Sequence, residues 1–496
     1  MRNKLDQLLE KASALEASGD AEAAAKLLER LLNRDPWHVD ATIRLANIEM
    51  SREEYAEAIG RLERLSRVKR DADRVGMTLM TAYMHAHLND EALAVALRLV
   101  SARPDDAWLR VLLARALIAR DDLGAAYREL EHALGLNPGV AEQGAIQHEM
   151  GRTLEQQGRH EESLLHYRQA ISLVPHLAHA HESLGCVLLR LGRFAQGWQE
   201  FEWRRHTPSF KYNMPPAPPE FYWTGHEDLL GRSILVLNEQ GLGDGIQFSR
   251  YLPQLKSLGA QVIYGVWHSL APLISPAMPG IRVVTGTIQG MQTAYLCSVL
   301  SLPAAFKTNF ETMPAKIPYL YADPERMQRW QPLLSASAGC RIGLAWAGRP
   351  KQFNDPRRSA PAHTFLGITA APCATFYSLQ HQVKESDRAA LDANKSLVRI
   401  GEMTTEFADI AAIIAQLDLV ITVDTSIAHL AGALGKPVWI LLAFVPDWRW
   451  FLDRDDSPWY PTARLFRQPA PGAWGPVIER VKDELVRGTW RRSASA

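Results

Sequence analysis

Small and apolar side chains recur at a fixed interval through the first two hundred residues of the chain. Four alanines stand 34 residues apart, namely Ala24, Ala58, Ala92 and Ala126. A large apolar residue follows most of them by four positions, and after a three-residue insertion Gly151 and Gly185 repeat the same interval. An irregular helical bundle would not keep one period through four consecutive units. The pattern therefore predicts repeated pairs of antiparallel helices that approach closely at the small residues.

This pattern resembles tetratricopeptide repeats, with about six units over residues 1–205. The resemblance implies an α solenoid in which the first helix of each pair lines a concave surface. The positions that the register places on that surface are Ile43, Met50, Met77, Met84, Trp108, Val111 and Ile118. Such an apolar lining suits an amphipathic helix or an extended apolar peptide of a protein partner. Packing of some of these side chains between repeats is the alternative.

The character of the sequence changes after residue 205. Residues 206–231 are rich in proline and aromatic residues and have no helical period, which indicates a linker. Beyond it, short β-branched apolar runs alternate with helical stretches, a pattern typical of parallel sheets covered by helices. A polar segment divides these runs into two sets. We therefore expect two α/β domains, at 232–325 and 326–496.

The composition disfavours several classes of binding partner and site. Lys+Arg 55 and Asp+Glu 55 leave no net charge, so nothing draws the whole protein to nucleic acid or to an anionic membrane. The 4 cysteines are far apart and form no C-x-x-C pair, which disfavours a zinc site or a disulfide framework. The chain has no apolar stretch long enough for stable membrane insertion, and its first residues lack the apolar core of a signal peptide. These features predict a soluble, cytoplasmic protein with free thiols.

The loop after the first predicted strand carries candidate chemistry. Gly241 and Gly243 allow a tight turn out of the strand, and Asp244 stands near the start of the next helix. A dinucleotide site would need a third glycine where Ile246 stands, and no acidic residue ends the second strand, so a nicotinamide or flavin enzyme is disfavoured. Asp244 is either a helix-capping residue or a general base facing the cleft between the domains.

Two loops of the last predicted domain could bind a diphosphate. The loop after RIGLAWAG carries four cations, Arg349, Lys351, Arg357 and Arg358. Clustered cations at a strand end suit a diphosphate, with a solvated loop as the alternative. A later strand ends in Asp424, Thr425 and Ser426, where a helix begins. Backbone N–H groups and hydroxyls at a helix start bind phosphate, and a carboxylate at a strand tip can accept hydrogen bonds from sugar hydroxyls.

Together, the strings EQGLGDGIQFSRYLPQLKSLGA, WAGRP…RRSAP and VDTSIAHLAGALGKPVW resemble the heptosyltransferase-like glycosyltransferases of family 9. The resemblance covers about residues 232–490. It implies a GT-B fold, that is, two Rossmann-like domains around a cleft, with the acceptor side in 232–325 and the nucleotide-sugar side in 326–496. It also implies an inverting mechanism without a metal or a cofactor, because the nucleotide-sugar is a co-substrate.

The family's motifs assign roles to single residues. Asp244 resembles the general base that deprotonates the acceptor hydroxyl. Asp424 would hold the donor sugar. The other positions placed on the donor side are Trp346, Gly348, Arg358, Ser359, Gln380, Thr425, Ser426 and His429.

Three features depart from the family's pattern. Ser426 stands where the family usually has glycine, which alters the approach of the backbone to the phosphate. The first α/β domain is short for a lipopolysaccharide heptosyltransferase. Asp453 and Asp455 form a D-x-D string like that of a metal-dependent glycosyltransferase fold, but they stand in a loop after the last expected strand and are predicted to form a surface turn.

The two halves together predict a glycosyltransferase whose acceptor is a protein held by the repeats. Flagellin or another surface protein would fit by analogy with similar architectures. Two alternatives remain: a lipopolysaccharide or glycolipid glycosyltransferase, and a catalytically inactive repeat scaffold that binds a protein partner.

Overall fold

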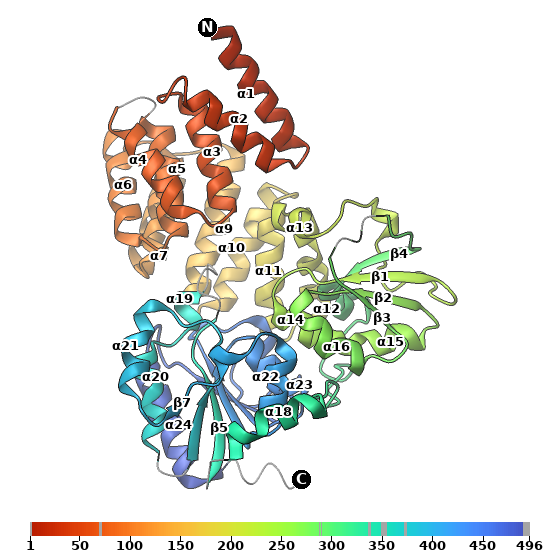
Figure 1. Ribbon diagram of the computed structural model, residues 1–496. Coiled ribbons are helices and arrows are strands. Elements are labelled where there is room, and N and C mark those ends of the chain that lie inside the picture. The colour runs from red at the N-terminus through yellow and green to blue at the C-terminus, as the bar shows by residue number, and fades with distance from the viewer. Residues whose placement is uncertain are drawn as a thin grey trace. The chain divides into compact units, whose positions relative to one another are not determined.

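The computed structural model describes residues 2–68, 72–286, 288, 290–335, 339–348, 355–371 and 374–489. The chain forms two compact units, Met1–Leu177 and Ala178–Ala496. The first is built of helices and the second carries two parallel sheets (Figure 1).

The first unit consists of consecutive helix pairs, each packed as a hairpin. The helices are α1 (Arg2–Ala17), α2 (Ala21–Leu32), α3 (Val39–Ser51), α4 (Tyr55–Ser66), α5 (Ala72–His85), α6 (Asn89–Ala102), α7 (Ala107–Ala119), α8 (Leu123–Gly135), α9 (Val140–Gln156) and α10 (His160–Leu173). The alanines of the 34-residue period are completely buried where neighbouring helices meet. The repeated helical architecture predicted from the period is therefore confirmed.

The same period appears in the backbone at the end of the first helix of each pair. The residue just past that helix has a positive φ of 59–84°, at Gly19, Glu53, His87, Asp121, Gly158 and, in the second unit, Gly192. The next N–H then donates to the carbonyl five residues earlier, as Glu54 does to Glu49 at 2.9 Å. This left-handed cap turns the chain into the second helix of the pair. Three of the six positions hold a residue other than glycine, although residues with a side chain usually prefer a negative φ.

The predicted groove residues fall into two groups. Ile43, Met50, Met77, Met84 and Trp108 are half-buried, as residues at the edge of a surface would be. Val111 and Ile118 are only 1% and 4% exposed, and the prediction that they line an open groove needs correction. Their helix, α7, packs against α5, α6, α8 and α9, so its side chains are covered on nearly every face.

The second unit contains ten short strands among the described residues. They are β1 (Ser233–Leu237), β2 (Gln261–Gly265), β3 (Arg282–Val284), β4 (Tyr295–Ser298), β5 (Cys340–Ala345), β6 (Ala374–Ser378), β7 (Leu397–Val398), β8 (Leu419–Val423), β9 (Val438–Leu442) and β10 (Ala463–Arg467). The first sheet has the order β3-β2-β1-β4 and the second β10-β9-β8-β5-β6-β7, and every pairing is parallel. The parallel sheets expected from the apolar runs are confirmed, with β4, β7 and β10 added to the runs that the pattern identified.

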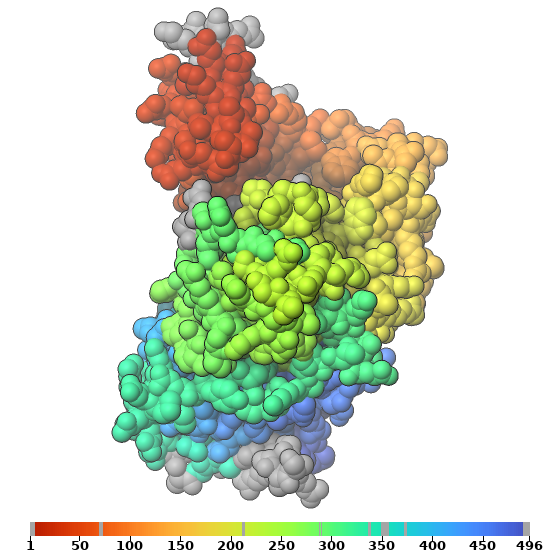
Figure 2. Space-filling model, turned by 90° about the vertical axis from the view of Figure 1, so that its right-hand side faces the viewer, coloured from red at the N-terminus to blue at the C-terminus, as the bar shows by residue number. Residues whose placement is uncertain are grey.

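Short helices surround these sheets. They are α13 (Pro208–Asn213), α14 (Leu242–Phe248), α15 (Leu252–Ser257), α16 (Ala271–Ala277), α17 (Leu302–Ala305), α18 (Pro324–Ser335), α19 (Asp355–Arg358), α20 (Ala362–Phe365), α21 (Glu385–Ala393), α22 (Phe407–Ile414), α23 (Ser426–Ala433) and α24 (Trp474–Arg487). The 3₁₀ turns are η1 (Glu202–His206), η2 (Pro219–Phe221), η3 (Ser249–Tyr251), η4 (His268–Leu270), η5 (Val299–Ser301), η6 (Leu366–Ala370), η7 (Gly401–Met403) and η8 (Trp448–Trp450). Figure 2 shows the two halves of this unit, the first in green and the second in teal and blue, in contact with each other.

The sixth helix pair, α11 (Ala178–Arg190) and α12 (Phe194–Phe201), belongs to the second unit by its packing. Trp198 donates from its indole Nε1 to the carbonyl of Thr308 at 2.7 Å and packs edge-on against Trp448 at 5.3 Å between ring centroids. The helix pairs thus continue through α12, which ends at Phe201, while the last pair packs against the sheet-bearing part through aromatic contacts.

Two glycines inside helices provide a matched test of the close packing of the sixth helix pair. A Cβ at Gly185 in α11 would lie 2.5 Å from the backbone nitrogen of Phe201, whereas a Cβ at Gly60 in α4 would meet nothing within 4 Å. We expect Gly185→Ala to lower the free energy of unfolding by roughly 1–3 kcal/mol, because backbone atoms must move apart. Gly60→Ala should raise it by about 0.5–1 kcal/mol, because alanine is the better helix former. Urea unfolding of both variants checks this, and an equal response of the two would contradict the close approach.

Candidate functional site

Each sheet of the second unit has one place where the strand order reverses. β1 lies between β2 and β4 in the first sheet, and β5 lies between β6 and β8 in the second. In open parallel sheets, ligands bind in the crevice outside the carboxyl ends of the strands at such a point. The predicted loops follow β1, β5 and β8, so the topology brings them to these two crevices.

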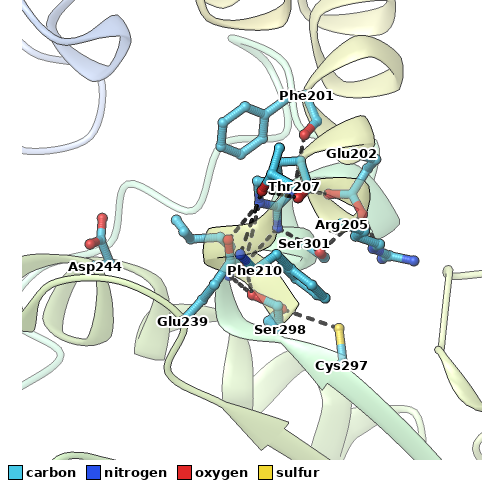
Figure 3. A network of polar contacts seen from close by, with 12 residues as sticks. Phe201, Glu202, Arg205, Thr207, Phe210, Glu239, Asp244, Cys297, Ser298 and Ser301 are labelled. Carbon is cyan, nitrogen blue, oxygen red and sulfur yellow. Dashed lines mark hydrogen bonds and ion pairs between the residues drawn. The ribbon is translucent and has the colours of Figure 1, made fainter. Parts of the chain in front are cut away.

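The crevice of the first sheet is filled by an arginine from the end of the sixth helix pair. Arg204 is buried and donates from Nε and Nη2 to the two carboxylate oxygens of Glu239, each at 3.0 Å. Glu239 follows β1, and Ser298 at the end of β4 donates to the same carboxylate at 2.5 Å (Figure 3). Arg204 Nη2 also donates to Ser301 at 2.8 Å. The end of the first sheet is therefore closed by protein side chains at this point.

The loop after β1 continues beyond the Arg204–Glu239 pair and packs against the second half of the unit. Helix α14 begins at Leu242 and lies against α23. A Cβ at Gly243 would lie 2.8 Å from Cδ2 of His429 and 3.5 Å from the Cα of Ser426. Only glycine allows the first turn of α14 to come this close to the first turn of α23. The structure thus brings the predicted base loop and the predicted phosphate-binding helix together.

Both carboxylate oxygens of Asp244 accept a hydrogen bond, yet the side chain remains partly exposed to solvent. Its Oδ2 accepts from the backbone N–H of Gly241 at 2.7 Å, which is the capping role, and its Oδ1 accepts from Arg449 Nη2 at 2.5 Å. The side chain is 15% exposed. Burial raises the pKa of Asp244, and the positive charge of Arg449 opposes that rise. Each oxygen still has capacity for one further hydrogen bond.

Arg449 and Asp447 are site residues that the sequence analysis missed. They stand at the loop after β9, and Arg449 Nη1 donates to Asp447 Oδ1 at 2.8 Å. Burial tends to raise the pKa of Asp447, but Arg449 and a backbone hydrogen bond outweigh this effect and lower the pKa. Because this loop follows the carboxyl end of a strand, its position in the sequence could have identified it as part of the site. The D-x-D string further along the same loop is exposed at both Asp453 and Asp455, as the sequence predicted.

Asp424 directly follows β8, and nearby negative and positive groups shift its pKa in opposite directions. Burial raises the pKa of Asp424 to about 6, and the negative charge of Asp447 adds to the rise. The positive charge of Arg358, from the loop after β5, acts in the opposite direction. The predicted carboxylate and the predicted cation therefore act on each other within one site.

The start of α23 is capped by its own threonine. Thr425 Oγ1 accepts from the N–H of Ile427 at 3.3 Å, and Ser426 is the first residue of the helix. His429, one turn further, pairs through Nδ1 with the Tyr460 hydroxyl at 3.0 Å and stacks on Trp450. Burial lowers the pKa of His429 to about 3, so this imidazole is neutral at pH 7. It therefore brings no positive charge to a phosphate.

Two of the predicted donor contacts support the loop after β5 instead. Trp346 is 0% exposed and its indole donates to Asp387 at 2.9 Å, so its side chain lies in the core and cannot line the site. Gln380 accepts from the N–H groups of Trp346 and Ala347 and donates to the carbonyls of Ala347 and Gln382. Its amide is saturated by backbone groups. These two assignments are corrected to loop-positioning roles.

The rest of that loop is described only in part. Gly348 donates from its N–H to the Ser359 hydroxyl at 3.1 Å, which ties the start of the loop to its end. The predicted cations Arg349 and Lys351 lie outside the described residues. In the described part of the chain, no cluster of three His, Cys, Asp or Glu side chains is suited to hold a metal ion. None of the helices described there has the length and apolar character needed to cross a bilayer.

Family comparisons agree with both halves of the chain. Models of tetratricopeptide repeats match residues 15–83 and 148–201, and the model of glycosyltransferase family 9 (heptosyltransferase) matches residues 384–443. The last match includes β8, Asp424 and the start of α23. It points to glycosyl transfer, and the repeats point to protein interaction.

Individual relatives extend over different parts of the chain. Protein FlbA of Caulobacter vibrioides is 26% identical across 94% of this chain and 87% of its own length. Among solved structures, a TPR protein of Thermus thermophilus is 21% identical over 37% of this chain and 99% of its own, with a TM-score of 0.33. MamA of Desulfovibrio magneticus is 16% identical over 34% of this chain and 94% of its own, with a TM-score of 0.30.

The raised pKa of Asp424 predicts a pH-dependent cost to stability. The folded-state pKa of about 6 lies above the unfolded value of about 4, so stability falls as the pH rises through that interval. Asp424→Asn removes the ionisation and should raise the free energy of unfolding above pH 6, by roughly 1–3 kcal/mol. The difference should vanish below about pH 4. Urea unfolding across this pH range measures it, with the exposed Asp455→Asn as control. A variant no more stable than wild type at pH 8 would contradict the assignment.

Proposed function

Because the chain joins tetratricopeptide repeats to a segment of glycosyltransferase family 9, we propose that it transfers a sugar from a nucleotide-sugar donor to a protein acceptor. The observation that carries this proposal is that the loop with Asp244, after β1, packs against the start of α23, which follows Asp424, while the charge of Arg358 acts on Asp424. The two sheet-bearing halves would then be the two Rossmann-like domains of a GT-B fold.

The donor side would lie at the reversal point of the second sheet. Arg358 and the N-terminus of α23, at Thr425 and Ser426, would stabilise the negative charge of the diphosphate. Asp424 would accept hydrogen bonds from sugar hydroxyls. The closed crevice of the first sheet, occupied by Arg204, supports placing the nucleotide on the second sheet.

The acceptor side would be served by Asp244. Its carboxylate takes the proton of the acceptor hydroxyl while the hydroxyl oxygen forms a bond to the anomeric carbon. The bond between that carbon and the diphosphate oxygen breaks, and its electron pair leaves with the diphosphate. Attack from the side opposite the leaving group inverts the configuration. This reaction needs no metal if Arg358 and the helix start neutralise the leaving group.

The repeats would hold the acceptor. Half-buried Met77, Met84 and Trp108 present adaptable apolar surface of the kind that binds amphipathic helices. A surface protein such as flagellin, modified in the cytoplasm, is an acceptor of this chemistry. A glycolipid acceptor and an inactive scaffold are the competing functions, and the binding test below addresses the second of them.

A thermal-shift panel with UDP, GDP, ADP, CMP and their sugars tests the donor site. A ligand present at about 100 times its dissociation constant adds ~2.7 kcal/mol to the state that binds it. We expect one nucleotide class to raise the unfolding temperature of the wild type. Asp424→Ala should lose the shift, and Asp455→Ala, in the exposed D-x-D string, should keep it. If no nucleotide shifts the wild type, the scaffold function replaces this proposal.

The role of Asp244 is tested separately with the donor that binds. We expect Asp244→Asn to retain the thermal shift, because the donor contacts lie on the other sheet, and to lose transfer by a factor of roughly 10²–10⁴. Release of free nucleotide during transfer is the measurement. Unchanged release in the variant would remove Asp244 from the mechanism.

A further inference from the structure

The loop after β9 places a buried arginine against the proposed base. The guanidinium of Arg449 is held on three sides: Nη2 donates to Asp244 at 2.5 Å, Nη1 to Asp447 at 2.8 Å and Nε to the side-chain oxygen of Gln247 at 2.8 Å. Asp244 and Gln247 come from α14 of the first half, whereas Arg449 and Asp447 come from the second half. The guanidinium therefore joins the two halves of the unit at the Asp244 carboxylate.

Arg449 is fixed from behind as well. Its guanidinium lies 4.4 Å from the centre of the Trp448 ring and 5.3 Å from that of Phe248. The loop that carries it is held by the sixth helix pair, because Arg190 Nε donates to the carbonyl of Pro446 at 2.9 Å and the Trp198 ring packs edge-on against Trp448. The last repeat thus supports the position of this side chain.

We propose that Arg449 is a positioning residue for Asp244: its guanidinium fixes the direction of the carboxylate and keeps it ionised, and the sixth helix pair holds Arg449 in place. This inference rests on the proposed function of Asp244 as the base. It makes the last repeat a part of the reaction centre, in addition to any role in binding a partner.

The charges around Asp244 show why such a residue is needed. Burial raises the pKa of Asp244, and the negative charges of Asp447 and of Glu239, at the end of β1, raise it further. Tyr264 of β2 is a neutral neighbour, since burial raises the pKa of its hydroxyl well above its usual value. Arg449 supplies the opposing positive charge, and the Gly241 N–H adds a hydrogen bond in the same direction. A base must be ionised before it can accept a proton, and burial alone would leave Asp244 protonated over a wider pH range.

The test is a direct titration of the Asp244 carboxyl carbon by ¹³C NMR in the full chain, with no ligand present. The resonance is identified by its loss in Asp244→Asn. We expect Arg449→Gln to move the titration midpoint to higher pH by roughly one unit or more, because a close opposite charge is lost. Asp447→Asn should move the midpoint in the opposite direction, because a negative charge is removed. Asp447 is more exposed than Arg449, so this variant keeps the test informative if Arg449→Gln fails to fold.

Arg250→Gln is the matched control. Arg250 is also buried and also joins the two halves, donating to the carbonyl of Trp459 at 2.8 Å and to the Tyr319 hydroxyl at 3.0 Å, but no carboxylate among the described residues accepts a hydrogen bond from it. Its loss should leave the Asp244 midpoint in place. Arg190→Ala should raise the Asp244 midpoint by less than Arg449→Gln does, because the variant loosens the loop after β9 while the guanidinium of Arg449 stays in the chain.

The outcomes separate this inference from the proposed function. An unmoved midpoint in both Arg449→Gln and Asp447→Asn, or an equal shift in Arg250→Gln, would overturn the positioning role. An unmoved midpoint in Arg190→Ala would overturn the part assigned to the last repeat. If the midpoints move as expected while no nucleotide shifts the unfolding temperature, the positioning geometry stands and the proposed transferase function fails.

Discussion

The buried ion pair between Arg204 and Glu239 occupies the carboxyl edge of the first sheet in the second unit. It joins the end of the sixth helix pair to the carboxyl edge of the first sheet, and Glu202, Ser298 and Ser301 make further hydrogen bonds to it. Removing Arg204 would leave the Glu239 carboxylate buried without a compensating charge, a loss that typically costs about 3–5 kcal/mol. The two buried side chains therefore fill this part of the sheet edge. They close the reversal point of one sheet and leave that of the other sheet for the candidate donor site.

Two partly buried aspartates of the second unit, Asp244 and Asp424, stand in an electrostatically unfavourable environment. The negative charge of Asp447 raises the pKa of both Asp244 and Asp424, and burial raises the pKa of these two carboxyls as well. Arg449 and Arg358 offset this repulsion only in part. Carboxylates with opposing influences of this kind are common at functional sites, where stability is reduced for the sake of activity. The two aspartates that the family motifs selected are those held in this unfavourable state.

The sequence pattern predicted the elements with strong periodicity and missed the weak ones. The 34-residue period defined the helix pairs because each pair must bury the same face against its neighbours. The strand β7 has only two residues and β10 carries two arginines, so neither presents a run of apolar residues. The repeat register predicts Val111 and Ile118 on the surface, but a register gives only the direction of a side chain and not the number of helices packed around it. Trp346 and Gln380 stand in a motif at the right strand ends, yet their side chains point into the core and the loop backbone.

The sequence by itself determined the repeats, the parallel sheets and the loops that carry Asp244, Arg358 and Asp424, because these depend on periodicity and on the residues next to each strand end. Only the tertiary structure decided which side chains meet. The contacts of Arg449 with Asp244 and of Arg204 with Glu239 join residues 205 and 35 positions apart. No local pattern encodes such contacts, since each requires the folding of both partners and the exclusion of water between them. For the same reason, the ionisation of Asp244 and Asp424 follows from burial and neighbouring charge, which exist only once the chain has folded.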